Sequence, residues 1–309
     1  MSEKKILVTG ANGFLGRNLC KKLISSNIPV FPISGNSSTN DYSIDLSSDF
    51  DLTPQLEDCH TVIHCAGRAH IRKKRKKENF LFNKINFEGT EKLAMQAKEA
   101  GIKKFILISS AGVMGRVSKF PNKISVDDKT NPYDDYTLSK LRGEEALVNV
   151  CFNSDMAYVI LRPPLIYGAY SPGNWEILIK ILKLNIPLPF ASTENHRSFI
   201  YLGNLISLIE KCLEMKEQKN KIFLVSDNDD VSTSRLIELI LKYMKKKNRM
   251  FKFNKKLIMI FAKLIGRKDT ANQLYNNLQL DIAKTMNEMD WTPKYSLEEG
   301  IKLSVNYDI

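Results

Sequence analysis

The sequence predicts an α/β protein built on a doubly wound parallel sheet, with a smaller lobe at its C-terminal end. Short apolar runs alternate with helically periodic stretches in the first half of the 309-residue chain, which is the pattern of parallel strands joined by crossover helices. A glycine-rich loop follows the first apolar run. Beyond residue 165 the alternation gives way to loops and amphipathic helices. We therefore predict one domain over residues 1–165 and a lobe over 166–309, with some interleaving of segments.

The predicted strands are apolar runs bounded by turn-forming residues, at residues 5–9, 28–33, 61–66, 105–109 and 157–161. Helical periodicity lies between them, at residues 14–24, 80–100 and 136–150. In sheets of this kind, ligands bind beyond the carboxyl ends of the strands. We therefore expect the functional site at that edge.

The first segment at this edge is the loop Gly10-x-x-Gly13-x-x-Gly16, between a predicted strand and a predicted helix. Its glycines permit a tight turn, close approach of the backbone to a pyrophosphate, and close packing of helix on strand. The N-terminus of the helix then faces the phosphates. This context predicts a Rossmann domain that binds a dinucleotide.

Proton-transfer chemistry is indicated by Tyr136 and Lys140, one turn apart on a predicted helix, and by a Ser109-Ser110 pair after a predicted strand. A phenol has an ordinary pKa of about 10. An ammonium on the same helix face is expected to lower that pKa and favour the anion. A serine of this pair is expected to hold the substrate oxygen. These groups suit proton exchange at an alcohol or ketone, with the dinucleotide carrying hydride.

The C-terminal half is predicted to bind substrate, with amphipathic helices over residues 175–184, 202–215 and 233–244. The stretch 245–267 is both basic and apolar, so it could form a helix on a membrane surface. We prefer a helix packed on the lobe, because its apolar positions serve equally well as core. The longest apolar run, residues 257–262, is too short to cross a bilayer, so no stable membrane insertion is expected.

The composition, with 43% hydrophobic and 26% charged residues, is ordinary for a soluble protein. Five scattered cysteines without a Cys-x-x-Cys pair indicate neither a disulfide framework nor a zinc site, and no metal site is predicted. This scattered pattern suits a reducing compartment. Residues 1–4 lead directly into the first strand with no room for a signal peptide. A cytoplasmic protein is therefore expected.

Part of the net charge of +12 lies in a basic run from Arg72 to Lys77. No aromatic residues are interleaved with this run and no nucleic-acid-binding motif accompanies it, so nucleic acid is not an expected partner. We interpret the run as a solvated loop, in a basic chain that attracts an anionic substrate.

Together the motifs resemble those of the extended short-chain dehydrogenase/reductase family, which includes the NAD-dependent epimerases, dehydratases and ketoreductases of nucleotide sugars. The resemblance covers nearly the whole chain and implies an NAD(H) or NADP(H) cofactor and a homodimer. It rests on the glycine loop and on Asp45-Leu46, His64-Cys-Ala-Gly67, Asn86 with Glu88-Gly-Thr90, Ser109-Ser-Ala-Gly-Val113, Tyr136-Thr-Leu-Ser-Lys140 and Leu161-Arg-Pro163.

The resemblance also implies individual roles. Ser110, Tyr136 and Lys140 match the catalytic residues. Asp45 and Leu46 would hold adenine, and Pro163 would lie near the nicotinamide. The implied cofactor contacts are Gly10, Asn12, Gly13, Phe14, Leu15, Gly16, Asp45, Leu46, Ala66, Gly67, Tyr136, Lys140 and Pro163.

The second half resembles the narrower bacterial group of UDP-N-acetylquinovosamine dehydrogenases, chiefly through Arg162-Pro-Pro-Leu-Ile-Tyr-Gly168 and Arg197-Ser-Phe-Ile-Tyr-Leu-Gly-Asn204. These 4-ketoreductases reduce the C4 ketone of a UDP-2-acetamido-2,6-dideoxy-hexos-4-ulose in the synthesis of O-antigen lipopolysaccharide. By this resemblance Arg197 contacts the UDP diphosphate, a role that suits its forked donors. Asn174 and Arg267 are weaker candidates for substrate contacts, beside Ser110.

Departures from the family pattern bear on function. Many epimerases carry a tyrosine where this chain has Met114, before Gly115. The preferred hypothesis is therefore an NAD(P)H-dependent 4-ketoreductase that makes UDP-N-acetylquinovosamine or its C4 epimer, and the alternative is a UDP-hexose 4-epimerase acting on UDP-glucose or UDP-GlcNAc. A dehydratase fits less well, and a non-catalytic dinucleotide sensor is a remote alternative because the Ser-Tyr-Lys set is complete.

The sequence does not distinguish a preference for NAD from one for NADP. The second predicted strand is followed by Ser34-Gly35, without the acidic residue that binds an NAD ribose and without an arginine for the 2′-phosphate of NADP.

Overall fold

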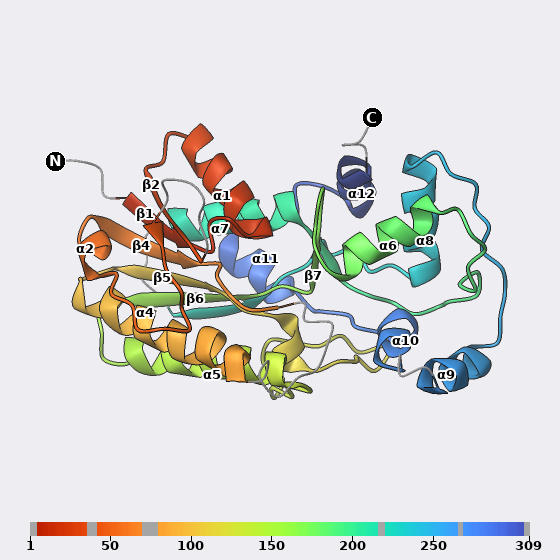
Figure 1. Ribbon diagram of the computed structural model, residues 1–309, viewed down its shortest axis with the longest axis horizontal. Coiled ribbons are helices and arrows are strands. Elements are labelled where there is room, and N and C mark those ends of the chain that lie inside the picture. Colours follow the sequence, from red (N-terminus) through yellow and green to blue (C-terminus); the bar gives the residue numbers. More distant parts are fainter. Residues whose placement is uncertain (1–4, 36–41, 70–79, 216–219, 265–267, 306–309) are drawn as a thin grey trace.

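The computed structural model describes residues 5–35, 42–69, 80–215, 220–264 and 268–305. Its centre is a seven-stranded sheet in the order β3-β2-β1-β4-β5-β6-β9, in which all neighbouring strands are parallel. Figure 1 shows helices on both faces of this sheet and a further group of helices beside it. The predicted doubly wound α/β fold with an additional lobe is therefore confirmed.

Five strands of the sheet correspond to predicted strands, with ends that differ from the predicted ends by at most two residues. β3 is only two residues long and exposed, so no apolar run announces it. β9 comes from the half assigned to the lobe and returns to pair with β6. The strands are β1 (Lys5–Thr9), β2 (Val30–Ser34), β3 (Tyr42–Ser43), β4 (Cys59–His64), β5 (Lys104–Ile108), β6 (Ala157–Arg162) and β9 (Lys221–Leu224).

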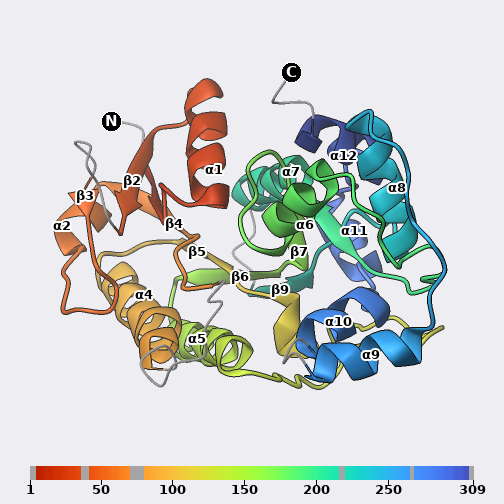
Figure 2. The same cartoon turned by 45° about the vertical axis from the view of Figure 1, so that its right-hand side comes forward.

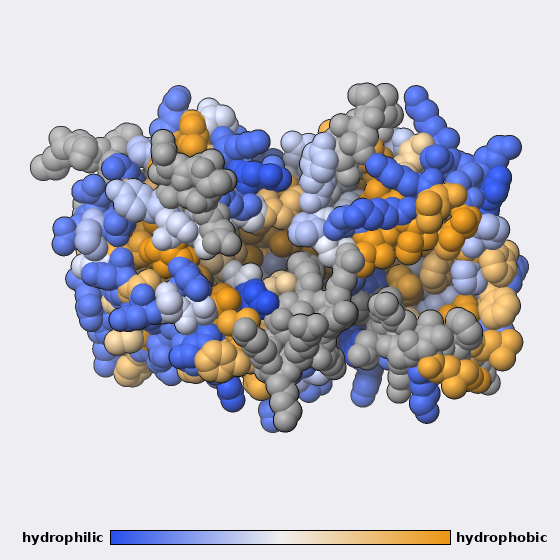
Figure 3. Space-filling view, viewed as in Figure 1, coloured by the Kyte–Doolittle hydropathy of each residue, from blue (hydrophilic) through white to orange (hydrophobic). Residues whose placement is uncertain are grey.

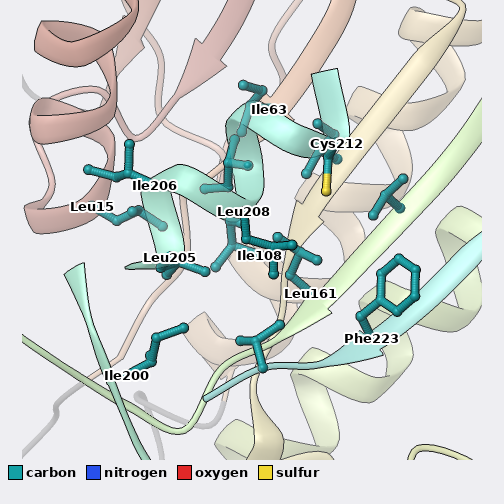
Figure 4. Packing of buried hydrophobic residues seen from close by; sticks show 14 of the residues in the cluster. Leu15, Ile63, Ile108, Leu161, Ile200, Leu205, Ile206, Leu208, Cys212 and Phe223 are labelled. Carbon is teal, nitrogen blue, oxygen red and sulfur yellow. The ribbon is translucent and has the colours of Figure 1, made fainter. Parts of the chain in front are cut away.

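Apolar side chains alternate between the two faces of the sheet. On β1, Ile6 and Val8 join one hydrophobic cluster and Leu7 joins the other. Figure 4 shows side chains of α1 and α7 packed over the sheet in the first cluster. That face is covered by α1 (Phe14–Ser25), α7 (Leu202–Glu214) and α11 (Ala283–Met289), and the other by α2 (Thr53–Leu56), α4 (Gly89–Glu99) and α5 (Asp135–Cys151).

The predicted helix over residues 80–100 contains a π-helical turn, η1 (Asn83–Glu88), directly before α4. Such turns insert an extra residue into the helical repeat and are frequent at functional sites. The turn buries Asn86 against α5. Hydrophobic periodicity does not reveal this change of helix type.

The lobe has its own core, formed around Tyr167, Trp175, Ile237 and Ile301. The chain enters it at β7, leaves it through α7 and β9, and enters it again at α8, so segments of the two parts are interleaved. Its elements are β7 (Leu165–Tyr167), α6 (Asn174–Lys183), β8 (Phe199–Tyr201), α8 (Thr233–Tyr243), α9 (Lys255–Leu264), α10 (Lys268–Tyr275) and α12 (Leu297–Val305).

The expectation for residues 245–267 holds only in part. Helix α9 begins only at Lys255. The chain before it pairs with another segment instead, where Phe251 donates its backbone N–H to Leu188 O at 3.0 Å. Leu257 and Ile260 are 54% and 57% exposed, so the expectation that apolar positions here are core is wrong for these two residues. Within the ranges given above, no helix has the length and apolar character needed to cross a membrane.

A buried chain of hydrogen bonds joins the ends of β1 and β4 to the helical layer. Thr90 donates its hydroxyl to Asn86 O at 2.9 Å, so its oxygen accepts from His64 Nε2 at 3.0 Å. His64 Nδ1 is then the acceptor for the Thr9 hydroxyl at 2.6 Å. Burial, with a smaller effect of the Lys140 charge, lowers the pKa of His64 to about 3, so the ring is neutral.

The low pKa of His64 makes its contribution to stability depend on pH. Above pH 6.5 the ring is neutral in both the folded and the unfolded states, and its contribution is complete. As the pH falls from 6.5 towards 3, only the unfolded state gains the proton. The advantage of the wild type over His64→Gln in free energy of unfolding should therefore shrink by about 1.4 kcal/mol per pH unit.

Urea denaturation of both proteins across this pH range measures the change. His60→Gln is the matched control, since His60 is exposed on the same strand. A wild-type advantage that stays constant below pH 6.5 would contradict the assignment.

Candidate active site

The carboxyl ends of four adjacent strands meet at one edge of the sheet. Gly10 follows β1, Ala66 follows β4, Ser110 follows β5 and Pro163 follows β6. The backbone N–H of Ala111 donates to Pro163 O at 2.8 Å, which joins the last two segments. Figure 3 shows the surface hollowed between the sheet and the lobe. Four segments that are distant in the sequence thus lie side by side, as expected for this fold.

The glycine loop is packed too closely for side chains. A Cβ on Gly10, whose φ is +68°, would lie 2.7 Å from Ala66 N, and one on Gly16 would lie 2.2 Å from Gly10 O. Helix α1 begins after Gly13, and neither a capping side chain nor an acidic residue in the described first turn competes for its N–H groups. This arrangement fits the pyrophosphate of a dinucleotide, which backbone donors at a helix N-terminus bind well.

The other residues implied as cofactor contacts surround this loop in different environments. Asn12 is exposed, whereas Leu15 is buried in the core against the sheet. The Leu15 side chain therefore packs inward, and its backbone is the part that faces the loop. Asp45 is exposed and accepts from Ser47 N at 2.8 Å and Ser47 Oγ at 2.7 Å, contacts that lower the pKa of its carboxyl group.

Two more of these residues make tight packing contacts. The ring of Phe14 lies 3.1 Å from the position of a Cβ on Gly168. Leu46 O would lie 2.8 Å from a Cβ on Gly89, so the segment after β3 rests on the start of α4.

Helix α5 carries Tyr136 in its first turn and Lys140 one turn later. Asp134 caps this helix by accepting from Thr137 N at 2.8 Å, and Thr137 Oγ1 accepts from Asp134 N in return, at 3.1 Å. The Ser110 hydroxyl lies close enough to the Tyr136 phenol to lower its pKa. Lys140 Nζ lies 3.3 Å from where a Cβ on Gly67 would be. The structure thus brings Ser110, Tyr136 and Lys140 to the strand ends.

The electrostatics differ from the sequence expectation. Burial raises the pKa of Tyr136 to about 12, and the neighbouring Ser110 hydroxyl only partly opposes this rise. Burial lowers the pKa of Lys140 to about 8, while Glu144 and Cys65 favour its charged form. Desolvation of both groups therefore outweighs the effect expected of the ammonium on the phenol.

Asn86 positions this site, a role that the motif comparison did not assign. Its Oδ1 accepts from Arg68 N at 2.8 Å and its Nδ2 donates to Arg68 O at 3.1 Å. Nδ2 also donates to Ser139 Oγ at 3.0 Å. The loop after β4 is thus tied to α5 between Tyr136 and Lys140. The sequence signal for this positioning role is an asparagine two residues before a Glu-Gly-Thr segment.

A buried ion pair lies next to Lys140. Arg162 donates to both oxygens of Glu144, with Nη2 to Oε2 at 2.6 Å, and the Ser109 hydroxyl also donates to Glu144. Arg162 Nη1 lies 2.8 Å from Met114 Sδ. The methionine that replaces the tyrosine of many epimerases is therefore part of this buried cluster.

Arg197 lies on the lobe side of the site. Its guanidinium donates to Asn276 O at 3.0 Å. Burial lowers its pKa to about 10, with Tyr133 and Arg116 as electrostatic neighbours, so it stays cationic at neutral pH. The Tyr133 hydroxyl lies 3.6 Å from the position of a Cβ on Gly112, next to Ser110. Tyr133 therefore links Arg197 to the Ser110 side.

The remaining predicted residues lie elsewhere. Asn174 is exposed at the first position of α6. Arg267 and the run from Arg72 to Lys77 lie outside the described residues. Within the part of the chain that is described, no group of three or more His, Cys, Asp and Glu side chains is arranged to hold a metal ion.

Several known proteins are similar to this chain in sequence and in fold. Residues 6–226 match the sequence model of the NAD dependent epimerase/dehydratase family. The chain is 35% identical to UDP-glucose 4-epimerase of Vibrio cholerae, over 97% of this chain and 94% of that protein. It is 27% identical to dTDP-4-dehydro-6-deoxyglucose reductase of Escherichia coli, over 96% and 95% of the two chains.

A solved structure has the same fold. UDP-glucuronic acid 4-epimerase of Bacillus cereus, in complex with UDP-glucuronic acid and NAD, superposes with a TM-score of 0.78 at 23% identity, over 98% of each chain. The family match and the nearly full-length similarity to the Vibrio cholerae enzyme agree with the glycine loop and the Ser-Tyr-Lys site. This chain therefore belongs to the NAD-dependent epimerase/dehydratase family.

Proposed function

We propose that the protein is a UDP-sugar 4-epimerase. One observation carries this proposal, the 35% identity to UDP-glucose 4-epimerase of Vibrio cholerae over 97% of the chain. The placement of the Ser110 hydroxyl near the Tyr136 phenol, beside a buried Lys140, supports it. The motifs of the second half favoured a reductase, whereas the similarity over the full length favours the epimerase.

In this proposal each residue has a stated task. Tyr136 exchanges a proton with the C4 oxygen of the sugar, and Ser110 holds the same oxygen by a hydrogen bond. The backbone of the glycine loop, the start of α1 and Lys140 would hold the dinucleotide. When bound, NAD or NADP supplies the hydride acceptor and donor that interconversion of an alcohol and a ketone requires.

Arg197 is proposed to bind the UDP diphosphate. Its position between Tyr133 and the carbonyl of Asn276 leaves a half-buried cation on the lobe side of Ser110. A guanidinium donates two parallel hydrogen bonds to phosphate oxygens, and these are stronger where water is excluded.

The second candidate is NAD(P)H-dependent reduction of the C4 ketone of a UDP-2-acetamido-2,6-dideoxy-hexos-4-ulose, for surface polysaccharide synthesis. One feature of the site favours it. With a pKa of about 12, Tyr136 is protonated at neutral pH. A protonated phenol is the acid that ketone reduction uses, whereas alcohol oxidation first requires its anion. The similarity to the Escherichia coli reductase also supports this candidate.

We also propose a cytoplasmic homodimer. All five cysteines lie among the described residues, where none of them forms a disulfide, and four of them are buried. Cysteines without disulfides are compatible with a reducing compartment. The homodimer follows from the family resemblance alone.

Replacing Tyr136 by phenylalanine should remove the proton donor without disturbing the fold. We expect turnover of the substrate to fall by about 10²- to 10⁴-fold, with unchanged thermal unfolding. Tyr158→Phe is the control, because Tyr158 lies near the opposite end of β6. Steady-state kinetics of both variants measures the effect. Turnover of Tyr136→Phe within threefold of the wild type would exclude the assigned role.

Replacing Arg197 by alanine should weaken UDP binding by roughly 1.5–3 kcal/mol, the range for a hydrogen bond to a charged group. Affinity for the dinucleotide should stay unchanged. Titration calorimetry with UDP measures the loss, and Arg235→Ala, which removes an exposed arginine of α8, is the control. If UDP binds equally well to Arg197→Ala, Arg197 has no role in diphosphate recognition.

The fate of the cofactor separates the two candidate reactions. An epimerase ends each cycle with its cofactor in the starting redox state, so the purified protein should interconvert UDP-glucose and UDP-galactose, or the two acetamido sugars, without consuming NADH. A reductase should be inactive on those sugars and should oxidise one NADH or NADPH per 4-keto-6-deoxy sugar. Product analysis by chromatography with parallel absorbance of the reduced cofactor distinguishes them. Stoichiometric oxidation without interconversion would replace the first candidate by the second.

A further inference from the structure

The outer margin of the lobe carries a surface that is both apolar and basic. We call it the α9 edge. Figures 1 and 2 both place α9 at the margin of the lobe, with α10 next to it. The exposed residues of the α9 edge are Lys245, Lys246, Lys247, Arg249, Phe251, Lys252, Phe253, Leu257, Ile260, Lys263 and Leu264.

The apolar part of the α9 edge is a stripe along one helix side. Leu257, Ile260 and Leu264 follow one another at intervals of three and four residues and are 54%, 57% and 79% exposed. Just before the helix, Phe251 and Phe253 are also exposed, with ring centroids 6.1 Å apart. Single exposed apolar residues are common, but a contiguous set marks an interaction surface.

The neighbouring segment extends this apolar surface. Leu188 pairs with Met250 and accepts a hydrogen bond from Phe251 N. The residues just before it, Leu184 and Ile186, are 69% and 48% exposed. A second chain segment therefore adds exposed apolar side chains close to Met250 and Phe251, which precede α9.

The charge of the α9 edge has one sign. Residues 245–264 contain no aspartate or glutamate, and their cations are Lys245, Lys246, Lys247, Arg249, Lys252, Lys255, Lys256 and Lys263. Among the described residues, the six exposed cations of the α9 edge make no ion pair with a carboxylate. An anionic partner would therefore not have to displace an existing salt bridge.

We propose that the α9 edge docks on the surface of an anionic phospholipid bilayer. Exposed leucine, isoleucine and phenylalanine side chains on a helix gain free energy by entering the boundary between headgroups and acyl chains. The surrounding lysines are attracted to anionic headgroups, each contributing about 1 kcal/mol, which is about fivefold in affinity. Such docking is peripheral and requires no helix that crosses the membrane.

Two other partners fit the α9 edge less well. A second copy docked symmetrically would bring like charges together, since the segment has no acidic residue to oppose its cations. The phosphates of a nucleic acid could pair with the lysines. They would not bury the exposed apolar stripe of Leu257, Ile260 and Leu264. The bilayer is the partner that uses both properties. This inference does not depend on the proposed reaction.

Vesicle flotation of the full-length protein tests the proposal. We expect the protein to float with vesicles of phosphatidylcholine mixed with phosphatidylglycerol, and to stay unbound with phosphatidylcholine alone or at high salt. Lys246→Glu combined with Lys247→Glu should lower the partition coefficient by at least about 25-fold, from about fivefold per lysine. Leu257→Gln combined with Ile260→Gln should abolish flotation while the unfolding temperature is unchanged.

Matched control variants carry the same kinds of substitution on the sheet domain instead of the α9 edge. Lys21→Glu with Lys98→Glu changes the net charge equally, and Ile24→Gln with Phe152→Gln removes side chains that are 60% and 73% exposed. Both controls should bind like the wild type. The proposal is overturned if the wild type does not float with anionic vesicles, or if control and α9-edge variants lose binding equally. It is also overturned if the α9-edge variants instead abolish a dimer in light scattering, or binding to duplex DNA, with vesicle binding unchanged.

Discussion

The geometry of the candidate site depends on one close approach between two helices. A Cβ on Gly143 of α5 would lie 2.2 Å from the carbonyl oxygen of Asn86 in the π-helical turn. Only glycine allows α5 to lie at this distance. The Asn86 side chain then spans the gap to Arg68 and Ser139, which places Lys140 beside Gly67. The helix that carries Tyr136 and Lys140 and the loop that follows β4 are thus held by the same residue, Asn86.

Local sequence patterns predicted much of this molecule, because the relevant signals are short in range. The glycine loop with its flanking strand and helix is a continuous segment, and Tyr136 and Lys140 are neighbours on one helix. The π-helical turn at Asn86 leaves no mark in hydrophobic periodicity, and its contacts join residues far apart in the sequence. The pKa values of Tyr136 and Lys140 were also beyond prediction, since they depend on burial in the folded chain.

Three buried charged side chains, Lys140, Glu144 and Arg162, lie together at the candidate site. Glu144 follows Lys140 by one helical turn, and Arg162 makes a bidentate pair with it from the end of β6. Removing either partner from a buried pair leaves an uncompensated charge, which is far more costly than the pair itself. Glu144 also favours the charged form of Lys140, so the carboxylate links the integrity of the sheet edge to the protonation of the site.

The parallel pairing of β9 with β6 has a consequence for how this chain can be divided. A fragment that ended at residue 165 would lack β9 and α7, so the backbone donors and acceptors along the outer side of β6 would be open to strands of other molecules. The apolar face beneath α7 would be open to water as well. The two parts therefore cannot be exchanged between relatives at a single junction. A chimaeric protein that keeps the sheet intact needs junctions on both sides of the segment from α7 to β9.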